Sequence, residues 1–99
     1  MNDQKFKADA GKAQLSLVLP AAVFAIARVR EYGVNKYGNP DNWRAVEPQR
    51  YIDAMYRHLL KFVADPKGVD TESGLPHLWH ILCNADFLCE MMFSGVVDE

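Results

Sequence analysis

Apolar residues recur at helical spacing in three segments of the chain. Residues 21–32 are rich in helix formers and follow Pro20, a residue well suited to the first position of a helix. A second segment begins at Pro48 and a third around residues 73–76. Their apolar positions follow the i, i+3, i+4 rule of a buried face: Ile52, Met55, Tyr56, Leu59, Leu60 and Val63, then Leu78, Ile81, Leu82, Ala85, Leu88, Cys89 and Met92. This pattern predicts an all-α fold with three main helices.

Glycine and proline mark where these helices end. Gly33 is predicted to cap the first helix, and the loop that follows contains the turn-forming run 38–43. Residues 65–68 end the second helix, and the third ends near Gly95. Leucines alternate with other residues before Pro20, so residues 1–19 are predicted to form an extended arm.

Length limits the chain to one domain, residues 1–99. A chain of 99 residues has a large surface for its volume and therefore a thin core. We expect a small helical bundle of three main helices plus the N-terminal arm, completed by a second subunit, in a homo-oligomer of two or more chains.

The charge and hydropathy of the chain argue against duplex nucleic acid and a membrane as its partners. The net charge of −2 provides no basic field for duplex nucleic acid. No apolar run approaches the ~20 residues of a membrane span, and the N-terminal residues contain no apolar signal-peptide core. These features predict a cytoplasmic protein with reduced thiols. Basic residues gather in the first two thirds and acidic ones in the last third, an asymmetry that suits either an anionic ligand or pairing of subunits.

The third helix carries a polar flank beside its apolar stripe. His77, His80 and Asn84 fall together on that flank at about 100° per residue. The His-x-x-His spacing lets two imidazoles converge on one metal ion. Alternatively, His77 helps to cap the helix and His80 forms a hydrogen bond across an interface.

The second helix and the segment before the third add further candidates. Asp53 and Arg57 form either an ordinary i, i+4 ion pair or a phosphate site in which Asp53 orients the phosphate or binds a cation. His58, on the other edge of this helix, is placed to approach the histidine flank. Glu72 and Ser73 begin a helix start that suits an anion or plain capping.

The loop between the first two helices combines a cation, two aromatic rings and an amide. These groups are Lys36, Tyr37, Asn42 and Trp43. Stacking on a nucleobase and contacting its edge need such a set, although the rings equally suit tethering of the loop.

The ordered motifs of the chain resemble the phage and prophage dATP/dGTP diphosphohydrolase-like family, from about Asp9 to Glu90. The motifs are Asp9-Ala-Gly-Lys12, Tyr32-Gly-Val-Asn-Lys-Tyr-Gly38, Asn42-Trp43, Tyr51-x-Asp-Ala54, Arg57-His-Leu59 and Glu72-Ser-Gly-Leu-Pro-His-Leu-x-His80 with Asn84. The resemblance implies a small helical domain of viral origin that engages purine deoxynucleotides. The positions carried over are Lys12, Lys36, Tyr37, Asn42, Trp43, Asp53, Arg57, His58, Glu72, His77, His80 and Asn84.

The resemblance implies a purine-nucleotide diphosphohydrolase as the first candidate function. As a diphosphohydrolase, the chain would use Asp53, Glu72 and His58 as catalytic residues, with Mg²⁺ or Mn²⁺ held by His77, His80 and Asp53. The expected ligand-binding residues are Lys12, Lys36, Tyr37, Asn42, Trp43, Arg57, Ser73 and Asn84. The helices lack the Glu-x-x-Glu motif of MazG-like pyrophosphohydrolases, a departure that weighs against hydrolysis and leaves binding intact.

The alternative is a non-catalytic receptor that sequesters a nucleotide or a cyclic nucleotide immune signal. Such a protein would act against host defence in the cytoplasm of an infected cell. A purely structural adaptor bundle is a third class, which would leave the polar flank without a role.

Overall fold

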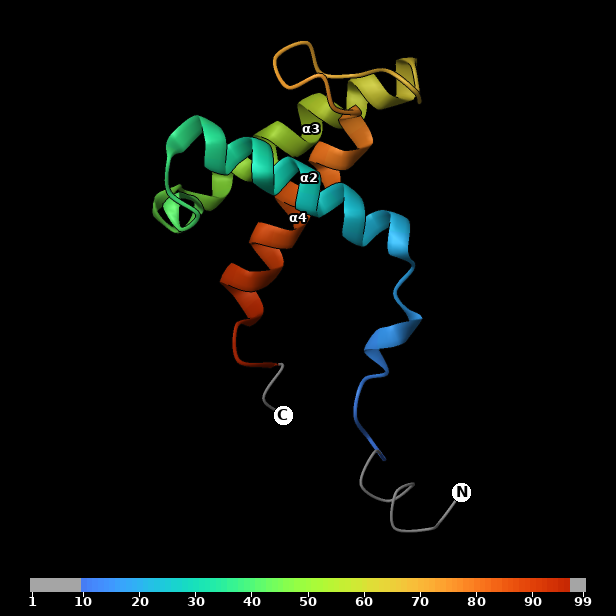
Figure 1. The fold of residues 1–99 in the computed structure, drawn as a ribbon, viewed down its shortest axis with the longest axis vertical. Coiled ribbons are helices and arrows are strands. Elements are labelled where there is room, and N and C mark those ends of the chain that lie inside the picture. The colour runs from blue at the N-terminus through green and yellow to red at the C-terminus, as the bar shows by residue number, and fades with distance from the viewer. Residues whose placement is uncertain (1–9, 97–99) are drawn as a thin grey trace.

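A computed structural model describes residues 10–96 of the chain (Figure 1). Three α-helices carry most of the described chain: α2 (Pro20–Tyr37), α3 (Pro48–Ala64) and α4 (His77–Phe93). Two short 3₁₀ helices precede the first two of them, η1 (Leu15–Leu17) and η2 (Asn42–Ala45). Residues 10–96 contain no strand, so the predicted all-α fold with three main helices is confirmed.

The helix α2 ends at Tyr37, five residues after the predicted end at Tyr32. Gly33 lies inside the helix, and the C-cap is Gly38, whose φ of 74° is in the left-handed region that glycine adopts without strain. The backbone N–H of Gly38 donates to the carbonyl of Val34 at 2.7 Å. The predicted end at Gly33 was therefore wrong, because one glycine costs a helix less than the four following residues gain by continuing it.

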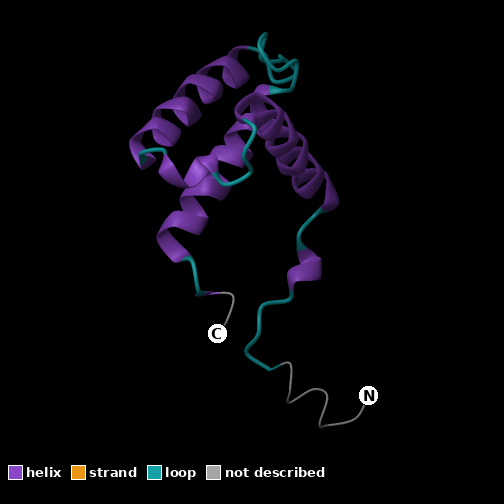
Figure 2. Ribbon diagram, turned by 60° about the vertical axis from the view of Figure 1, so that its left-hand side comes forward, coloured by secondary structure: helices purple, strands orange, loops and turns teal. Residues whose placement is uncertain are grey.

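The helix α4 holds the other two helices together. It packs against both α3 and α2, as the two ribbon views show (Figures 1 and 2). The buried residues come from all three helices: Ala25, Val29, Tyr51, His77 and Cys83. On α4 the buried side chains are His77, from the predicted histidine flank, and Cys83, which the predicted apolar stripe does not include.

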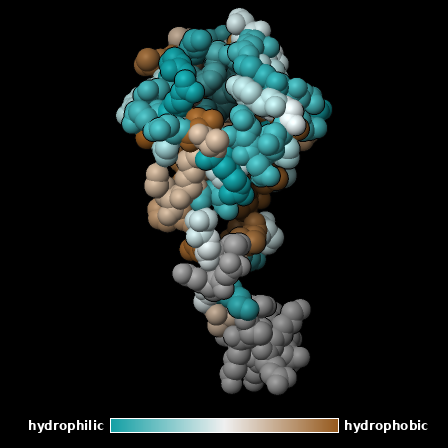
Figure 3. All heavy atoms as spheres, turned by 90° about the vertical axis from the view of Figure 1, so that its left-hand side faces the viewer, coloured by the Kyte–Doolittle hydropathy of each residue, from teal (hydrophilic) through white to brown (hydrophobic). Residues whose placement is uncertain are grey.

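Much of the predicted core is exposed in the single chain. On α3 the side chains of Tyr56, Leu60 and Val63 are 65%, 72% and 70% exposed. Leu78 and Met92 on α4 are also exposed. The prediction of a buried stripe is therefore wrong for these residues in one chain, whereas the other positions are half-buried, except the exposed Leu59 and Cys89: Ile52, Met55, Ile81, Leu82, Ala85 and Leu88. Apolar side chains accordingly reach the surface beside a largely hydrophilic area (Figure 3).

Residues 10–19 lead away from the helices (Figures 1 and 2). This part of the predicted arm is not uniformly extended, since η1 forms a turn in which the N–H of Val18 donates to the carbonyl of Leu15 at 3.1 Å. The rest of the predicted arm, residues 1–9, lies outside the described residues. Within residues 10–96, no helix has the length and apolar character to cross a membrane.

The connection between α3 and α4 is closed by its own backbone. An isolated antiparallel bridge joins Val69 to Pro76, and the N–H of His77 donates to the carbonyl of Gly68 at 3.1 Å. The N–H of Asp70 donates to the carbonyl of Leu75 at 2.8 Å. These bonds hold residues 68–76 as a tight loop against the start of α4.

Candidate functional site

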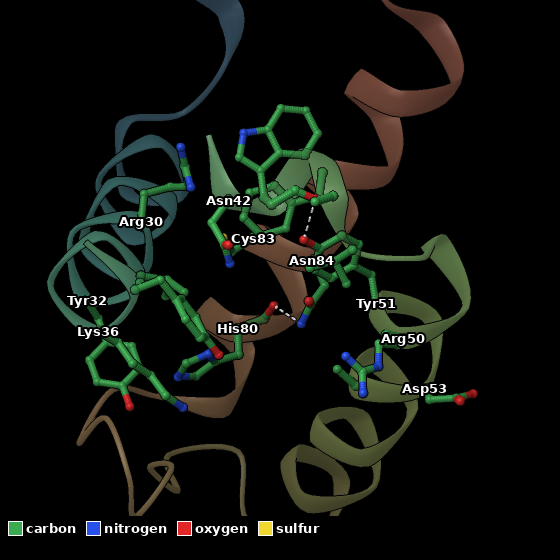
Figure 4. A pocket seen from close by; sticks show the side chains of 18 of the residues that line it. Arg30, Tyr32, Lys36, Asn42, Arg50, Tyr51, Asp53, His80, Cys83 and Asn84 are labelled. Carbon is green, nitrogen blue, oxygen red and sulfur yellow. Dashed lines mark hydrogen bonds between the residues drawn. The ribbon is translucent and has the colours of Figure 1, made fainter. Parts of the chain in front are cut away.

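A pocket of about 920 Å³ opens between α2 and α3, with α4 as its floor (Figure 4). Residues from α2, η2, α3 and α4 line it. Six of the eight predicted ligand-binding residues are among them: Lys36, Tyr37, Asn42, Trp43, Arg57 and Asn84. Segments far apart in the sequence thus bring most of the expected ligand set to one cavity.

The pocket is cationic although the chain is not. Its lining includes one carboxylate, Asp53, and four cationic side chains, Arg30, Lys36, Arg50 and Arg57. The net charge of the chain is −2. Since clefts lined by charges of one sign focus their field, this pocket favours an anionic ligand.

Arg30 and Arg50 are site residues that sequence reasoning missed. Arg30 donates to the carbonyl of Pro40 at 2.7 Å, and its guanidinium carbon lies 5.2 Å from the ring centroid of Phe87. Figure 4 shows Arg50 reaching toward the cavity from α3. Neither arginine belongs to a recognisable motif, so only the crossing of the helices reveals them.

The aromatic rings of the pocket differ in how much of each ring is accessible to a ligand. Trp43 stacks on Phe87 with ring centroids 5.2 Å apart and an angle of 12° between the rings, and Arg44 lies over the indole at 4.6 Å. Tyr37 is 59% exposed, with the ammonium of Lys36 5.3 Å from its ring centroid. Tyr37 is therefore the more accessible platform for a base, and Trp43 is largely engaged in packing.

The floor of the pocket is polar. Asn84 donates from Nδ2 to the main-chain carbonyl of His80 at 2.8 Å (Figure 4). The Nε2 atom of His80 lies 2.7 Å from the Oγ of Ser73. Ser73, predicted to touch the ligand, thus lies behind His80 and does not line the pocket.

Three imidazoles cluster behind this floor. The Nδ1 atoms of His58 and His77 are 2.9 Å apart, and the rings of His58 and His80 stack with centroids 4.6 Å apart. Burial lowers the pKa of His58 to about 4, helped by the charges of its two histidine neighbours. Burial also lowers the pKa of His80. The lowered pKa values favour the neutral form of His58 and of His80.

Asp70 completes this group and was missed by sequence reasoning. One ligand atom each of His58, Asp70 and His77 lie within 4.8 Å of one another, close enough to hold a metal ion. Burial raises the pKa of Asp70, but hydrogen bonds from Ser73 outweigh it and lower the pKa overall. Asp70 lies in the loop before α4, where no helical periodicity identifies it.

The structure does not bring the predicted metal and catalytic sets together. Oδ1 of Asp53 accepts a hydrogen bond from Gln49 at 3.0 Å, and its carboxylate points outward in Figure 4. Glu72 forms an ion pair with Lys36. Asp53 and Glu72 are thus engaged elsewhere, and the side chains that lie close enough together to hold a metal ion are His58, Asp70 and His77.

The structure also places Lys12, Asp53 and Arg57. Lys12 lies on the arm, outside the residues that line the pocket. Within residues 10–96, Asp53 and Arg57 do not form an ion pair. Arg57 instead lines the pocket without a carboxylate partner among these residues.

Comparison with known proteins identifies the family. The family described as "dATP/dGTP diphosphohydrolase, N-terminal" matches residues 2–98. The chain belongs to this family. A Salmonella phage PMBT28 protein named dATP/dGTP diphosphohydrolase is 38% identical over 82 residues, which make up 83% of the chain. The resemblance inferred from the motifs is thereby confirmed.

The chain covers only part of that relative. The chain spans 28% of the length of the phage protein. No solved structure matches the chain. The family provides a link to hydrolysis of deoxynucleoside triphosphates, and the chain corresponds to the N-terminal domain in the family description.

Proposed function

We propose that the pocket between α2 and α3 binds a purine deoxynucleoside triphosphate. The observation that carries this proposal is the concentration of four cationic side chains around one cavity of an acidic chain. The name of the phage relative supports the class of ligand. The protein would act in the cytoplasm of a phage-infected cell.

Different walls of the pocket would contact different parts of such a ligand. Arg50 and Arg57 on α3 and Lys36 on α2 would hold the phosphates, since guanidinium groups bind phosphate oxygens in a bidentate manner. The purine would stack on the exposed ring of Tyr37. Asn42 and Asn84 offer amides for the edge of the base.

The carboxylates of the pocket favour binding over two-metal hydrolysis. Mg²⁺ prefers oxygen ligands, and metal-assisted phosphate chemistry uses clustered carboxylates. Asp53 is the one carboxylate in the described lining, and it is turned outward. This lining does not fit a catalytic Mg²⁺ or Mn²⁺ pair and therefore does not support a hydrolytic step that depends on one.

The cationic lining of the pocket also supports a second candidate, a receptor that sequesters a nucleotide or a cyclic nucleotide signal without turning it over. Such a receptor needs cations and aromatic rings, which the pocket has. It needs no metal at the phosphates. The two candidates share the ligand class and differ in turnover.

Calorimetry with dATP, dGTP, dCTP, dTTP and cyclic AMP, with and without Mg²⁺ or Mn²⁺, tests the proposal. We expect the purine nucleotides to bind and Arg57→Gln to weaken binding about 10- to 100-fold, the cost of one charge-assisted hydrogen bond. Arg28→Gln is the matched control, because Arg28 pairs with Glu31 outside the pocket. Release of pyrophosphate would establish the hydrolase, whereas tight binding without release of pyrophosphate would establish the receptor. Equal binding of all probes, or none, would overturn the proposal.

We also propose that a second copy of this chain covers the exposed apolar face of α3. The face carries Tyr56, Leu60 and Val63, and the arm exposes Leu15, Leu17 and Leu19 as well. Basic residues in the first two thirds and acidic ones in the last third favour pairing of unlike ends. Sedimentation velocity should show a dimer or larger species that Leu60→Glu dissociates. The control Lys61→Gln, at an exposed position of α3, changes the net charge by the same amount and should leave the assembly intact, and a monomeric native protein would contradict the proposal.

A further inference from the structure

The cluster of His58, Asp70 and His77 lies where three segments of the chain meet. His58 comes from α3, Asp70 from the connecting loop and His77 from the first position of α4. Their ligand atoms lie within 4.8 Å of one another, and the Nδ1 atoms of the two histidines are 2.9 Å apart. None of the three lines the nucleotide pocket.

We propose that His58, Asp70 and His77 form a transition-metal site, with Zn²⁺ as the ion that fits them best. Two imidazole nitrogens and one carboxylate are a common zinc ligand set, and water completes the tetrahedron. The ligand atoms around such an ion lie about 3.3 Å apart, because metal–ligand bonds are about 2.0–2.2 Å long. The imidazoles need to separate by only a few tenths of an ångström, while the Asp70 carboxylate moves in.

The surroundings hold these ligands in place. The backbone N–H of Ser73 donates to Oδ2 of Asp70 at 2.8 Å, and the Oγ of Ser73 lies 2.7 Å from His80. His80 in turn stacks on His58 with an angle of 7° between the rings. Such outer partners orient metal ligands and are a usual feature of built metal sites.

The donor atoms select the class of metal. Imidazole suits Zn²⁺ and other first-row transition metals, whereas Mg²⁺ and Ca²⁺ prefer sites made of oxygen atoms. His77 is 7% exposed, while His58 and Asp70 are partly exposed and leave an entry path from solvent. The site is thus accessible to the ion and closed on the side of the core.

The expected consequence is structural. The bound ion would cross-link α3 to the start of α4 and restrict the movement of the loop between them. Because His80 stacks on His58 and also lines the pocket, the ion would restrict the movement of the pocket floor as well. The site needs no nucleotide, so it can exist whether or not the proposed function is correct.

Zinc alone tests the proposal, with no nucleotide present. Protein stripped with EDTA and lacking any affinity tag is titrated with Zn²⁺, Co²⁺ or Mg²⁺ while the unfolding temperature and bound metal are measured. We expect one Zn²⁺ per chain, a higher unfolding temperature with Zn²⁺ than with Mg²⁺, and the visible spectrum of tetrahedral Co²⁺. A native protein that binds no stoichiometric Zn²⁺ would overturn the proposal.

Two carboxylates of the same loop provide a matched pair of variants. Asp70→Asn should weaken Zn²⁺ binding at least ~100-fold, since loss of an outer partner alone costs 10- to 100-fold. Glu72→Gln, which alters the residue paired with Lys36, should leave Zn²⁺ affinity unchanged. His58→Gln, at a partly exposed position, gives a second ligand variant if Asp70→Asn fails to fold. Retention of native affinity by a folded ligand variant, or equal losses in Asp70→Asn and Glu72→Gln, would refute the assignment.

Discussion

The hydroxyl of Tyr51 donates a hydrogen bond to the main-chain carbonyl of Trp43 at 2.8 Å. This bond ties the start of α3 to η2, and the Tyr51 ring also lies 4.8 Å from the ring of Phe87 on α4. One buried tyrosine therefore joins three of the elements that surround the pocket.

Tyr51→Phe should lower the free energy of unfolding by about 1 kcal/mol, because it removes one of the two hydrogen bonds that the Trp43 carbonyl accepts and keeps the ring in place. Urea denaturation measures this change. Tyr56→Phe is the control, since the Tyr56 side chain is 65% exposed. Equal losses in the two variants would show that the bond to Trp43 contributes nothing specific.

Gly33 and Gly38 should respond in opposite directions to alanine. Gly33 lies inside α2, where an added Cβ meets nothing within 4 Å, so Gly33→Ala should stabilise the protein by about 0.5–1 kcal/mol. Gly38 has a φ of 74°, so Gly38→Ala should destabilise it by about 1–2 kcal/mol. Each variant is the control for the other in thermal or urea unfolding. If Gly33→Ala proved the more damaging, the helix end at Gly38 would be wrong.

This pair also shows how far sequence reasoning reached on the fold. Proline and apolar spacing were enough to predict three helices and the start of α3 at Pro48. They led to Gly33 rather than Gly38 as the cap, because both are glycines at plausible helix ends. They also turned Leu78 and Met92 of α4 inward, although both are exposed, since the packing of three helices decides which face is buried.

The site was predictable to the extent that it rests on local motifs. Lys36 and Tyr37 at the end of α2 and the pair Asn42 and Trp43 in η2 are close in sequence, and all four line the pocket. Asp70 escaped prediction because its contact with His58 and His77 depends on the path of a loop.

The ion pair of Lys36 and Glu72 predicts a specific pH dependence. The hydrogen bond from the Lys36 ammonium is the main cause that lowers the pKa of Glu72. The pair therefore stabilises the fold above the ordinary glutamate pKa of about 4.3, and this contribution is lost as the pH falls through the lowered value. Lys36→Gln should raise the pKa of Glu72 toward its ordinary value, as measured by carboxyl ¹³C NMR.

Arg44→Gln is the control for this titration, because Arg44 pairs with Asp41 at a separate place. It should leave the Glu72 titration unchanged. An unaltered Glu72 pKa in Lys36→Gln would show that the two side chains do not interact in solution.

The two cysteines should differ sharply in reactivity. Cys83 is 2% exposed, and burial raises the pKa of its thiol to about 12, whereas Cys89 is exposed. Since the thiolate is the reactive form, a disulfide reagent at pH 8 should modify native Cys83 at least 100-fold more slowly than it does in urea. The Cys89→Ser variant isolates this thiol, and Cys83→Ser reports Cys89 alone. Rapid reaction of native Cys89→Ser would mean that α4 turns a different face toward α2 and α3.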